Sequence, residues 1–310
     1  MARSSILWPG LASALANVFF GMTVVATRYV VPETDPLTLA FLRNAIATIT
    51  LLPLLAFAGS RRVRRADLLP IVALGAAQFG VFPFTFTTAL KFTLASRGAL
   101  VFALVPILTL GLAALRRVEP FTRLKLLGAL LALSGVLLSV GNRALFPAGG
   151  ERSLIGELFM FVTVLVGASY NVLSRPYLQR YPARLLIVYF MAAGTLFLAP
   201  FAAVQMAIEG FPAFTGFEWL LVLFVGTFGG SIGYLLFVWA LEKGTPARAA
   251  VFVPLNPVTA TVLAAALLRE ELTLFFLLGL ACVVTGILLT NHPRAQSQPA
   301  SPLRSGAGEQ

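Results

Sequence analysis

Long apolar segments separated by short polar turns make up almost the whole chain. Each segment has roughly the 20 residues that an α-helix needs to cross the hydrocarbon layer of a membrane, where Pro and Gly are tolerated inside helices. The pattern therefore predicts an all-α integral membrane protein with ten transmembrane helices. We place these helices at residues 6–31, 36–58, 67–89, 94–115, 122–141, 154–173, 183–207, 217–240, 246–268 and 272–291.

The composition supports this picture and excludes several kinds of site. Hydrophobic residues make up 58% of the chain and charged residues 11%, whereas soluble domains carry about 25% charged residues. The net charge of +11 could indicate a nucleic-acid partner, but the basic residues form short clusters between apolar segments, so the expected surroundings are a lipid bilayer and not nucleic acid. Cys282 and His292 are the single residues of their kinds, which excludes an intrachain disulfide and a zinc site of Cys and His. We predict no cofactor and no metal.

The distribution of charge predicts an orientation. If the N-terminus is cytoplasmic, 16 of the 23 basic residues and 4 of the 12 acidic residues fall on the cytoplasmic side. The positive-inside rule then places both termini in the cytoplasm. The expected location is the plasma membrane, or the inner membrane of a bacterium. Residues 293–310 are rich in Ser, Pro, Gly and Gln and are predicted to form a disordered cytoplasmic tail.

The two halves of the chain resemble each other at a constant spacing of 151 residues. The matched pairs include Ala89 and Ala240, Pro106 and Pro257, Glu119 and Glu270, Gly128 and Gly279, and Gly135 and Gly286. Each half holds five predicted helices, an odd number, so the second half must enter the membrane in the opposite direction. We therefore predict a first repeat at 1–143 and an inverted second repeat at 144–292 around a central cavity, an architecture typical of transporters. The alternative is a duplication that only built a stable bundle.

Two matched motifs carry a resemblance to a known family. The stretch ALKFTLASRGALVFALVP at 89–106 and its partner ALEKGTPARAAVFVPLNP at 240–257 are each followed by an apolar helix, a Glu at the turn and a G-x6-G helix. Over roughly 6–291 the chain resembles the EamA family of the drug/metabolite transporter superfamily. The resemblance implies ten spans, cytoplasmic termini, a central cavity and movement of a small metabolite. Within the family the chain is most similar to bacterial exporters of aromatic and other neutral amino acids.

Polar and aromatic residues inside the predicted helices are the candidates for substrate binding. A polar group in lipid is costly, and a pocket of aromatic side chains with a few amides suits an amphipathic small molecule. The candidates are Asn17, Phe20, Gln78, Phe79, Phe82, Tyr170, Asn171, Ser231, Tyr234, Trp239 and Asn256. The alternative is that the aromatic residues pack or face lipid, while the polar residues join helices.

Two prolines and two arginines add further hypotheses. Pro106 and Pro257 are predicted to kink their helices and shape the pathway, with simple packing as the alternative. Arg43 and Arg97 are candidates for contact with a substrate carboxylate, because a guanidinium matches that planar anion. Arg97 could instead reach the lipid headgroups, and Arg43 could be a structural cation bound to helix-end carbonyls.

The absence of certain motifs narrows the function. No Asp or Glu lies in the middle of a predicted helix, although proton-driven antiporters usually need one, so facilitated diffusion or exchange is expected. A Walker A motif, H-E-x-x-H and a G-x-S-x-G within the spans are absent, which argues against ATP-driven transport and against an enzyme. The sequence predicts a monomeric secondary carrier that exports small neutral metabolites, mainly amino acids including aromatic ones, by alternating access. Export of drugs or other metabolites, an intramembrane enzyme and a channel are the alternatives.

Overall fold

The computed structural model describes residues 4–53, 63–116, 122–145, 150–243 and 252–290, and every regular element in these ranges is helical. In chain order the elements are α1 (Ser4–Val30), η1 (Val31–Glu33), α2 (Pro36–Leu51), α3 (Arg65–Ala76), η3 (Ala77–Val81), α4 (Phe82–Phe92), α5 (Ala95–Phe102), α6 (Val105–Leu115), α7 (Arg123–Leu145), α8 (Gly150–Leu173), α9 (Arg175–Arg180), α10 (Ala183–Glu209), α11 (Gly216–Phe224), η4 (Val225–Ile232), α12 (Gly233–Lys243), α14 (Leu255–Leu267) and α15 (Leu274–Thr290). The predicted tail at 293–310 lies outside the described residues.

Six helical segments within the described residues are long and apolar enough to cross a membrane. They are Trp8–Glu33, Arg65–Phe92, Ala95–Leu115, Leu154–Arg180, Ala183–Glu209 and Gly216–Ala240. Three shorter apolar helices are Pro36–Leu51, Leu255–Leu267 and Leu274–Thr290. The prediction of an all-α protein with several membrane spans is therefore confirmed. The short helix α9 was not predicted, because its six residues, which include two arginines and a glutamine, follow directly on a long apolar segment.

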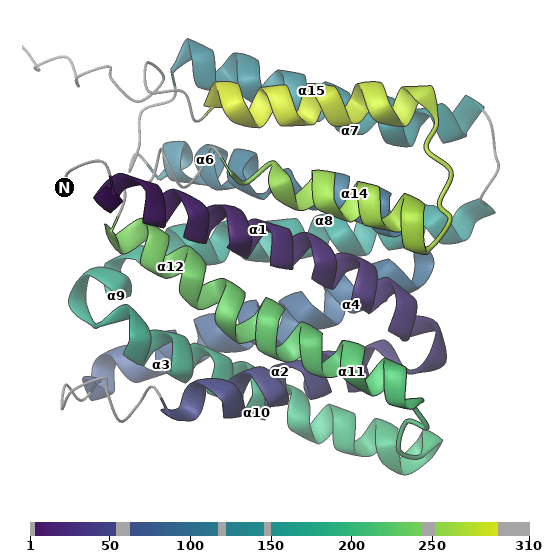
Figure 1. The fold of residues 1–310 in the computed structure, drawn as a ribbon. Coiled ribbons are helices and arrows are strands. Elements are labelled where there is room, and N and C mark those ends of the chain that lie inside the picture. The colour runs from purple at the N-terminus through teal and green to yellow at the C-terminus, as the bar shows by residue number, and fades with distance from the viewer. Residues whose placement is uncertain (1–3, 54–62, 117–121, 146–149, 244–251, 291–310) are drawn as a thin grey trace, which may run out of the picture.

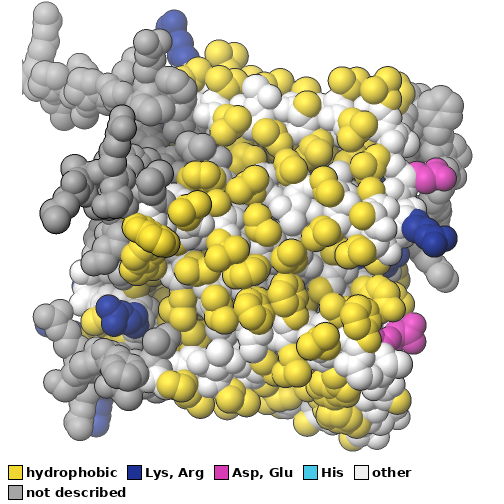
Figure 2. Space-filling model, viewed as in Figure 1, with side chains coloured by type: hydrophobic (Ala, Val, Ile, Leu, Met, Phe, Trp, Pro, Cys, Tyr) yellow, Lys and Arg dark blue, Asp and Glu magenta, His cyan; other side chains and the backbone are white. Residues whose placement is uncertain are grey.

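The outer surface is suited to lipid. Figure 2 shows hydrophobic side chains over the middle of the face and charged side chains at its two ends. Leu115, Leu196 and Ile208 are each more than 70% exposed, at 84%, 72% and 75%. Such wide apolar exposure is unfavourable in water and is satisfied by the hydrocarbon layer of a bilayer.

The helices lie roughly along one axis, and elements from the two halves of the chain interleave (Figure 1). Helix α1 packs against α12 and α14, whereas α8 packs against α4, α5 and α6. Helix α2 packs between α10 and η4, and α10 also covers α3. At the 151-residue spacing α4 corresponds to α12, and α1 and α8 are the first helices of the two halves. The contact of α4 with α8 in one half therefore has a counterpart in the contact of α12 with α1.

Helices α7 and α15 form a close pair at one edge of the bundle (Figure 1). A Cβ atom added to Gly128 would lie 2.6 Å from the carbonyl oxygen of Gly286, and one added to Gly135 would lie 2.5 Å from that of Gly279. Small residues let helix backbones approach this closely. The two contacts are related by the 151-residue spacing, because Gly128 matches Gly279 and Gly135 matches Gly286.

Two π-helical turns occupy matched positions in the long helices. The N–H of Phe82 bonds to the carbonyl of Ala77 at the end of η3, and the N–H of Gly233 bonds to the carbonyl of Phe228 at the end of η4. Each pair spans five residues, and the two pairs are again 151 residues apart. Single π turns inside α-helices are often found at functional sites, which directs attention to the space between η3 and η4.

Candidate functional site

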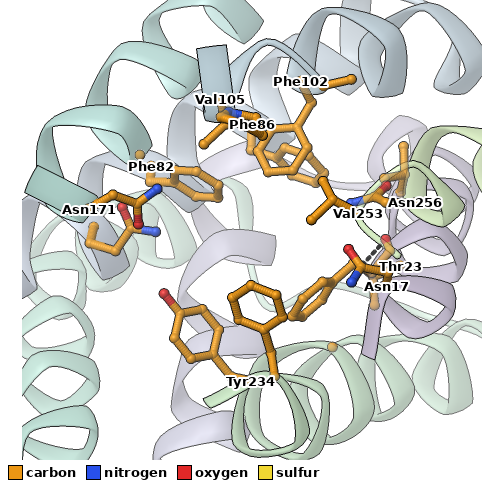
Figure 3. Close-up of a pocket in the computed structure, with 18 of the residues that line it drawn as sticks. Asn17, Thr23, Phe82, Phe86, Phe102, Val105, Asn171, Tyr234, Val253 and Asn256 are labelled. Atoms are coloured by element: carbon orange, nitrogen blue, oxygen red, sulfur yellow. Dashed lines mark hydrogen bonds between the residues drawn. The ribbon is translucent and has the colours of Figure 1, made fainter. Parts of the chain in front are cut away.

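A cavity of about 460 Å³ lies inside the bundle, within the usual range for small-molecule sites. Its walls come from both halves of the chain, from α1, α2, η3, α4, α5, α6 and α7 in the first and from α8, α10, η4, α12, α14 and α15 in the second. In Figure 3, Asn171 lies on one side of the open space and Asn17 and Asn256 lie on the other. Phenylalanine rings border the space above, and Tyr234 points toward it from below. The cavity is therefore apolar with a few amide groups.

Most of the sequence-predicted residues meet at this cavity. The predicted residues that line it are Asn17, Phe20, Arg43, Gln78, Phe79, Phe82, Pro106, Asn171, Tyr234, Asn256 and Pro257. Asn17, Gln78 and Asn256 are buried, and the Nδ2 of Asn17 donates to the Ser13 carbonyl at 2.8 Å. The side-chain oxygens of Gln78 and Asn256 are buried without a hydrogen-bond partner among the described residues.

Two of the predicted aromatic residues lie elsewhere. Tyr170 is buried in a cluster with Phe79 and Phe190, whose ring centroids lie 6.0 and 5.3 Å from its own in edge-to-face contacts. Trp239 is 39% exposed and is not among the residues that line the cavity. Tyr170 supports the cavity wall through Phe79, whereas Trp239 has no contact with the cavity.

Ser231 and Arg97 also lie outside the cavity lining. Ser231 is fully buried, and its hydroxyl donates to the Ala47 carbonyl of α2 at 3.0 Å. One turn earlier in α2, the Nδ2 of Asn44 donates to the Phe79 carbonyl in η3. Helix α2 is thus hydrogen-bonded to both π-helical turns, an arrangement that holds the cavity wall in place. Arg97 belongs to α5.

The structure adds polar lining residues that the sequence interpretation missed. They include Asn44, Thr109, Lys125 and Thr290. Asn44 was detectable as an amide inside an apolar segment, next to Arg43. Lys125 is 97% buried but belongs to a basic cluster at the start of a helix, so the charge pattern assigned it to a cytoplasmic turn.

The prolines occupy the first turns of helices rather than the middle of kinked ones. Helix α5 ends at Phe102 and α6 begins at Val105, with a tight turn in which the Leu104 N–H bonds to the Val101 carbonyl at 3.0 Å. Pro106 follows at the second position of α6, where its missing N–H is not required. The predicted kink is therefore a break between two half-helices.

A similar helix start is found in the second half. Helix α14 begins at Leu255, with Asn256 and Pro257 in its first turn. The first turns of α6 and α14 both line the cavity. Helix N-termini carry partial positive charge, and half-helices that begin inside a membrane bundle are used to hold anionic substrate groups in transporters.

The cavity reaches toward one end of the bundle. It extends to Lys125 in the first turn of α7 and to Thr290, the last residue of α15. In the opposite direction, no described lining residue lies beyond Val24 on α1 or Phe86 on α4. Among the described residues, the site therefore extends toward the end of the bundle at which the chain begins (Figure 1).

Hydrogen bonds between the two halves close the opposite end. The carboxylate of Glu270 accepts bonds from the Ala95 N–H at 2.7 Å, the Ser96 N–H at 3.0 Å and the Ser96 hydroxyl at 2.6 Å. Nearby, Arg28 donates to two carbonyls in the last turn of α4, at 2.6 and 3.0 Å. Glu270 thus joins the turn before α15 to the start of α5 across the end of the bundle.

Comparison with known proteins agrees with this fold. The model of the EamA-like transporter family matches residues 7–141 and residues 154–292. An uncharacterized transporter of Archaeoglobus fulgidus is 28% identical over 282 residues, which cover 91% of this chain and 98% of the relative. The uncharacterized transporter YetK of Bacillus subtilis is 24% identical over 286 residues, 90% of this chain and 85% of the relative.

Two further likenesses extend the comparison. A protein of Streptantibioticus cattleyicolor named "probable terminal-alkyne amino-acid exporter" is 25% identical over 255 residues, 82% of this chain and 83% of the relative. A crystal structure with a TM-score of 0.64 and 20% identity covers 93% of this chain and 96% of the solved one, which shows a shared fold. The two family matches cover most of the chain, and this multi-pass membrane transporter belongs to the EamA-like transporter family.

Proposed function

We propose that the protein is a secondary carrier that exports small neutral metabolites, mainly amino acids including aromatic ones, by alternating access. The cavity carries the proposal: it is lined by amide and aromatic groups, its described lining extends toward one end of the bundle, and bonds between the two halves join the helices at the other end. A binding site between two repeats that opens to one side at a time is the arrangement that carriers use. The similarity to a relative named as an amino-acid exporter supports the substrate class.

The proposed architecture is ten spans in two inverted repeats, at 1–143 and 144–292. The family model matches the chain twice, once in each half. The π-helical turns at one spacing and the exchanged glycine contacts of α7 with α15 support an axis of pseudo-symmetry between the halves. Two similar units can then rock between inward-open and outward-open states of comparable energy.

The proposed orientation places both termini in the cytoplasm, with a monomer in the plasma membrane. Helix α9 and the start of α3 lie at the end of the bundle where the chain begins (Figure 1), and they are joined by Arg180 and Asp67 at 3.4 Å. This end also carries Arg64, Arg65 and Arg175, as the positive-inside rule expects of the cytoplasmic side. The cavity then extends toward the cytoplasm, where an exporter takes up its cargo.

Transport by the purified full-length chain tests the proposal. In proteoliposomes we expect saturable uptake of labelled phenylalanine, tyrosine and leucine, and little uptake of glucose or of a cationic drug. Liposomes without protein are the control. Flux that rises linearly with concentration would favour a channel, and chemical alteration of a lipid or peptide without flux would favour an enzyme.

Transport is also expected to be insensitive to a pH gradient. None of the described residues that line the cavity is Asp or Glu, and proton-coupled carriers usually bind the proton on such a carboxylate within the membrane. The measurement is amino-acid flux with and without an imposed pH gradient, while the membrane voltage is clamped. Faster flux driven by the gradient would contradict the assignment of facilitated diffusion or exchange.

A further inference from the structure

Arg43 is a cation in the cavity, and no acidic side chain lies among the described residues that line the cavity with it. It lies in the middle of α2 and lines the cavity, and its guanidinium carbon lies 5.5 Å from the centre of the Phe86 ring. Its Nη1 is buried without a hydrogen-bond partner among the described residues, while part of the residue remains accessible. The face of the Phe86 ring attracts the positive charge. It does not, however, accept hydrogen bonds from the guanidinium N–H groups as an oxygen atom would.

The same chain shows what a purely structural arginine looks like. Arg28 donates from Nη1 to the carbonyls of Leu90 and Lys91, at 2.6 and 3.0 Å, and so joins α1 to the end of α4. Arg43 has no such carbonyl bond to Nη1. Because an unpaired charge at membrane depth is costly, a side chain of this kind is best explained by a partner that comes and goes.

The rest of the cavity favours a negative partner with an apolar body. Lys125 adds a second cation, no described lining residue is acidic, and the positive ends of α6 and α14 face the same space. Next to Arg43, the rings of Phe82, Phe86 and Phe102 contact one another with centroids 5.8 to 6.1 Å apart. An aromatic or aliphatic group would pack against this wall while its anion meets the guanidinium.

We infer that Arg43 binds the carboxylate of the transported molecule. This inference rests on the proposed carrier function and narrows its substrate class to aromatic or apolar monocarboxylates, of which neutral amino acids are one kind. The carboxylate is then required and the amino group is not. Amines and amides that lack a carboxylate leave the Arg43 charge without a counter-charge and are expected to bind weakly. An ammonium group only donates and is repelled, and an amide carbonyl accepts a hydrogen bond but carries no negative charge.

Four probes that differ in single groups test the requirement. Binding of L-phenylalanine, 3-phenylpropionate, L-phenylalaninamide and 2-phenylethylamine to the purified full-length chain would be measured by titration calorimetry near neutral pH. We expect the two carboxylates to bind at least about tenfold more tightly than the amide and the amine, because charge-assisted bonds to a carboxylate are strong.

Substitution then tests Arg43 itself. Arg43→Gln is expected to weaken binding of the two carboxylates at least about tenfold and to leave the weak binding of the amide unchanged. Arg43→Lys should retain part of the affinity, because a lysine keeps the charge but not the planar fork. The matched control is Arg184→Gln, which removes one charge from an exposed position on α10 and should bind like the wild type. Gel filtration checks that each variant is folded. The preference of the wild-type protein for the carboxylate probes can be measured even if a variant does not fold.

The outcomes separate this inference from the proposed function. Equal affinity for L-phenylalanine and its amide, or unchanged carboxylate binding by folded Arg43→Gln, overturns the inference even if amino acids are transported. Carboxylate-selective binding without amino-acid flux supports the inference and contradicts the proposed amino-acid export. Failure of all four probes to bind the wild type overturns the assignment of Arg43.

Discussion

Alanine at Gly135 is expected to destabilise the protein strongly, whereas alanine at Gly111 is expected to be harmless. A Cβ at Gly135 would lie 2.5 Å from the Gly279 carbonyl oxygen and 2.8 Å from the Cβ of Cys282, so α7 and α15 would have to separate. Overpacking of this kind costs about 1–3 kcal/mol. A Cβ at Gly111 in α6 meets nothing within 4 Å, and alanine there removes up to about 1 kcal/mol of helix penalty.

The comparison is made by heating each purified variant and following the folded fraction by gel filtration with fluorescence detection. Gly286→Ala is a second test, because its Cβ would lie 2.5 Å from the Gly128 carbonyl oxygen on the matched side of the same contact. We expect Gly135→Ala and Gly286→Ala to lose similar stability. Equal melting of the Gly135 and Gly111 variants would contradict the close approach of α7 and α15.

The helices could be predicted because the bilayer imposes a simple rule. Every predicted span has a helix within its described residues, since backbone groups in lipid must bond within their own segment. The break between Phe102 and Val105 could not be predicted in the same way. Pro106 removes one N–H in either case, and whether the helix bends or restarts depends on the neighbouring helices that support the turn.

The π-helical turns left no signal in the apolar pattern. Gln78 and Gly229 lie at matched positions within these turns, yet one is polar and the other is small. Each turn is hydrogen-bonded to α2, through Asn44 to the Phe79 carbonyl and through Ser231 to the Ala47 carbonyl. These contacts join residues that are far apart in the sequence, so periodicity cannot reveal them.

The candidate site was predicted in part because a buried polar group is costly. That argument selected Asn17, Gln78 and Asn256, which line the cavity. It also selected Ser231, whose hydroxyl is satisfied by the Ala47 carbonyl of a neighbouring helix. The cost of burial alone does not distinguish a group that faces substrate from one that joins two helices, because both are polar and both are buried.

Removal of the Glu270 carboxylate is expected to open the closed end of the cavity. Helix α5 begins after Leu94, which offers no side-chain acceptor, so the N–H groups of Ala95 and Ser96 depend on Glu270 from the other half of the chain. Each hydrogen bond to a charged group contributes about 1.5–3 kcal/mol. Loss of one such bond would raise the population of the state open at this end by at least about tenfold.

The turn that carries Glu270 provides a matched control. Arg269 has φ of 53°, the one positive φ of a non-glycine residue in the described ranges, and the Glu270 N–H bonds to the Ala264 carbonyl at 3.2 Å. Glycine adopts this left-handed conformation more readily than arginine. Arg269→Gly should therefore keep the turn and the Glu270 bonds, although it also changes the local charge.

The measurement is side-specific labelling of a single cysteine. In a Cys282→Ala background, Val24→Cys places a thiol at the inner limit of the cavity on α1, and a membrane-impermeant maleimide is applied from the side where Glu270 lies. Glu270→Ala should raise the labelling rate at least about tenfold. Ser96→Ala should raise the labelling rate less, because the two backbone bonds to Glu270 remain. Arg269→Gly should leave the labelling rate unchanged. Unchanged labelling in Glu270→Ala would show that these bonds do not hold the end closed. Transport rate alone would not decide the question, since a misfolded carrier is also slow, whereas labelling from this side rises only when this end opens.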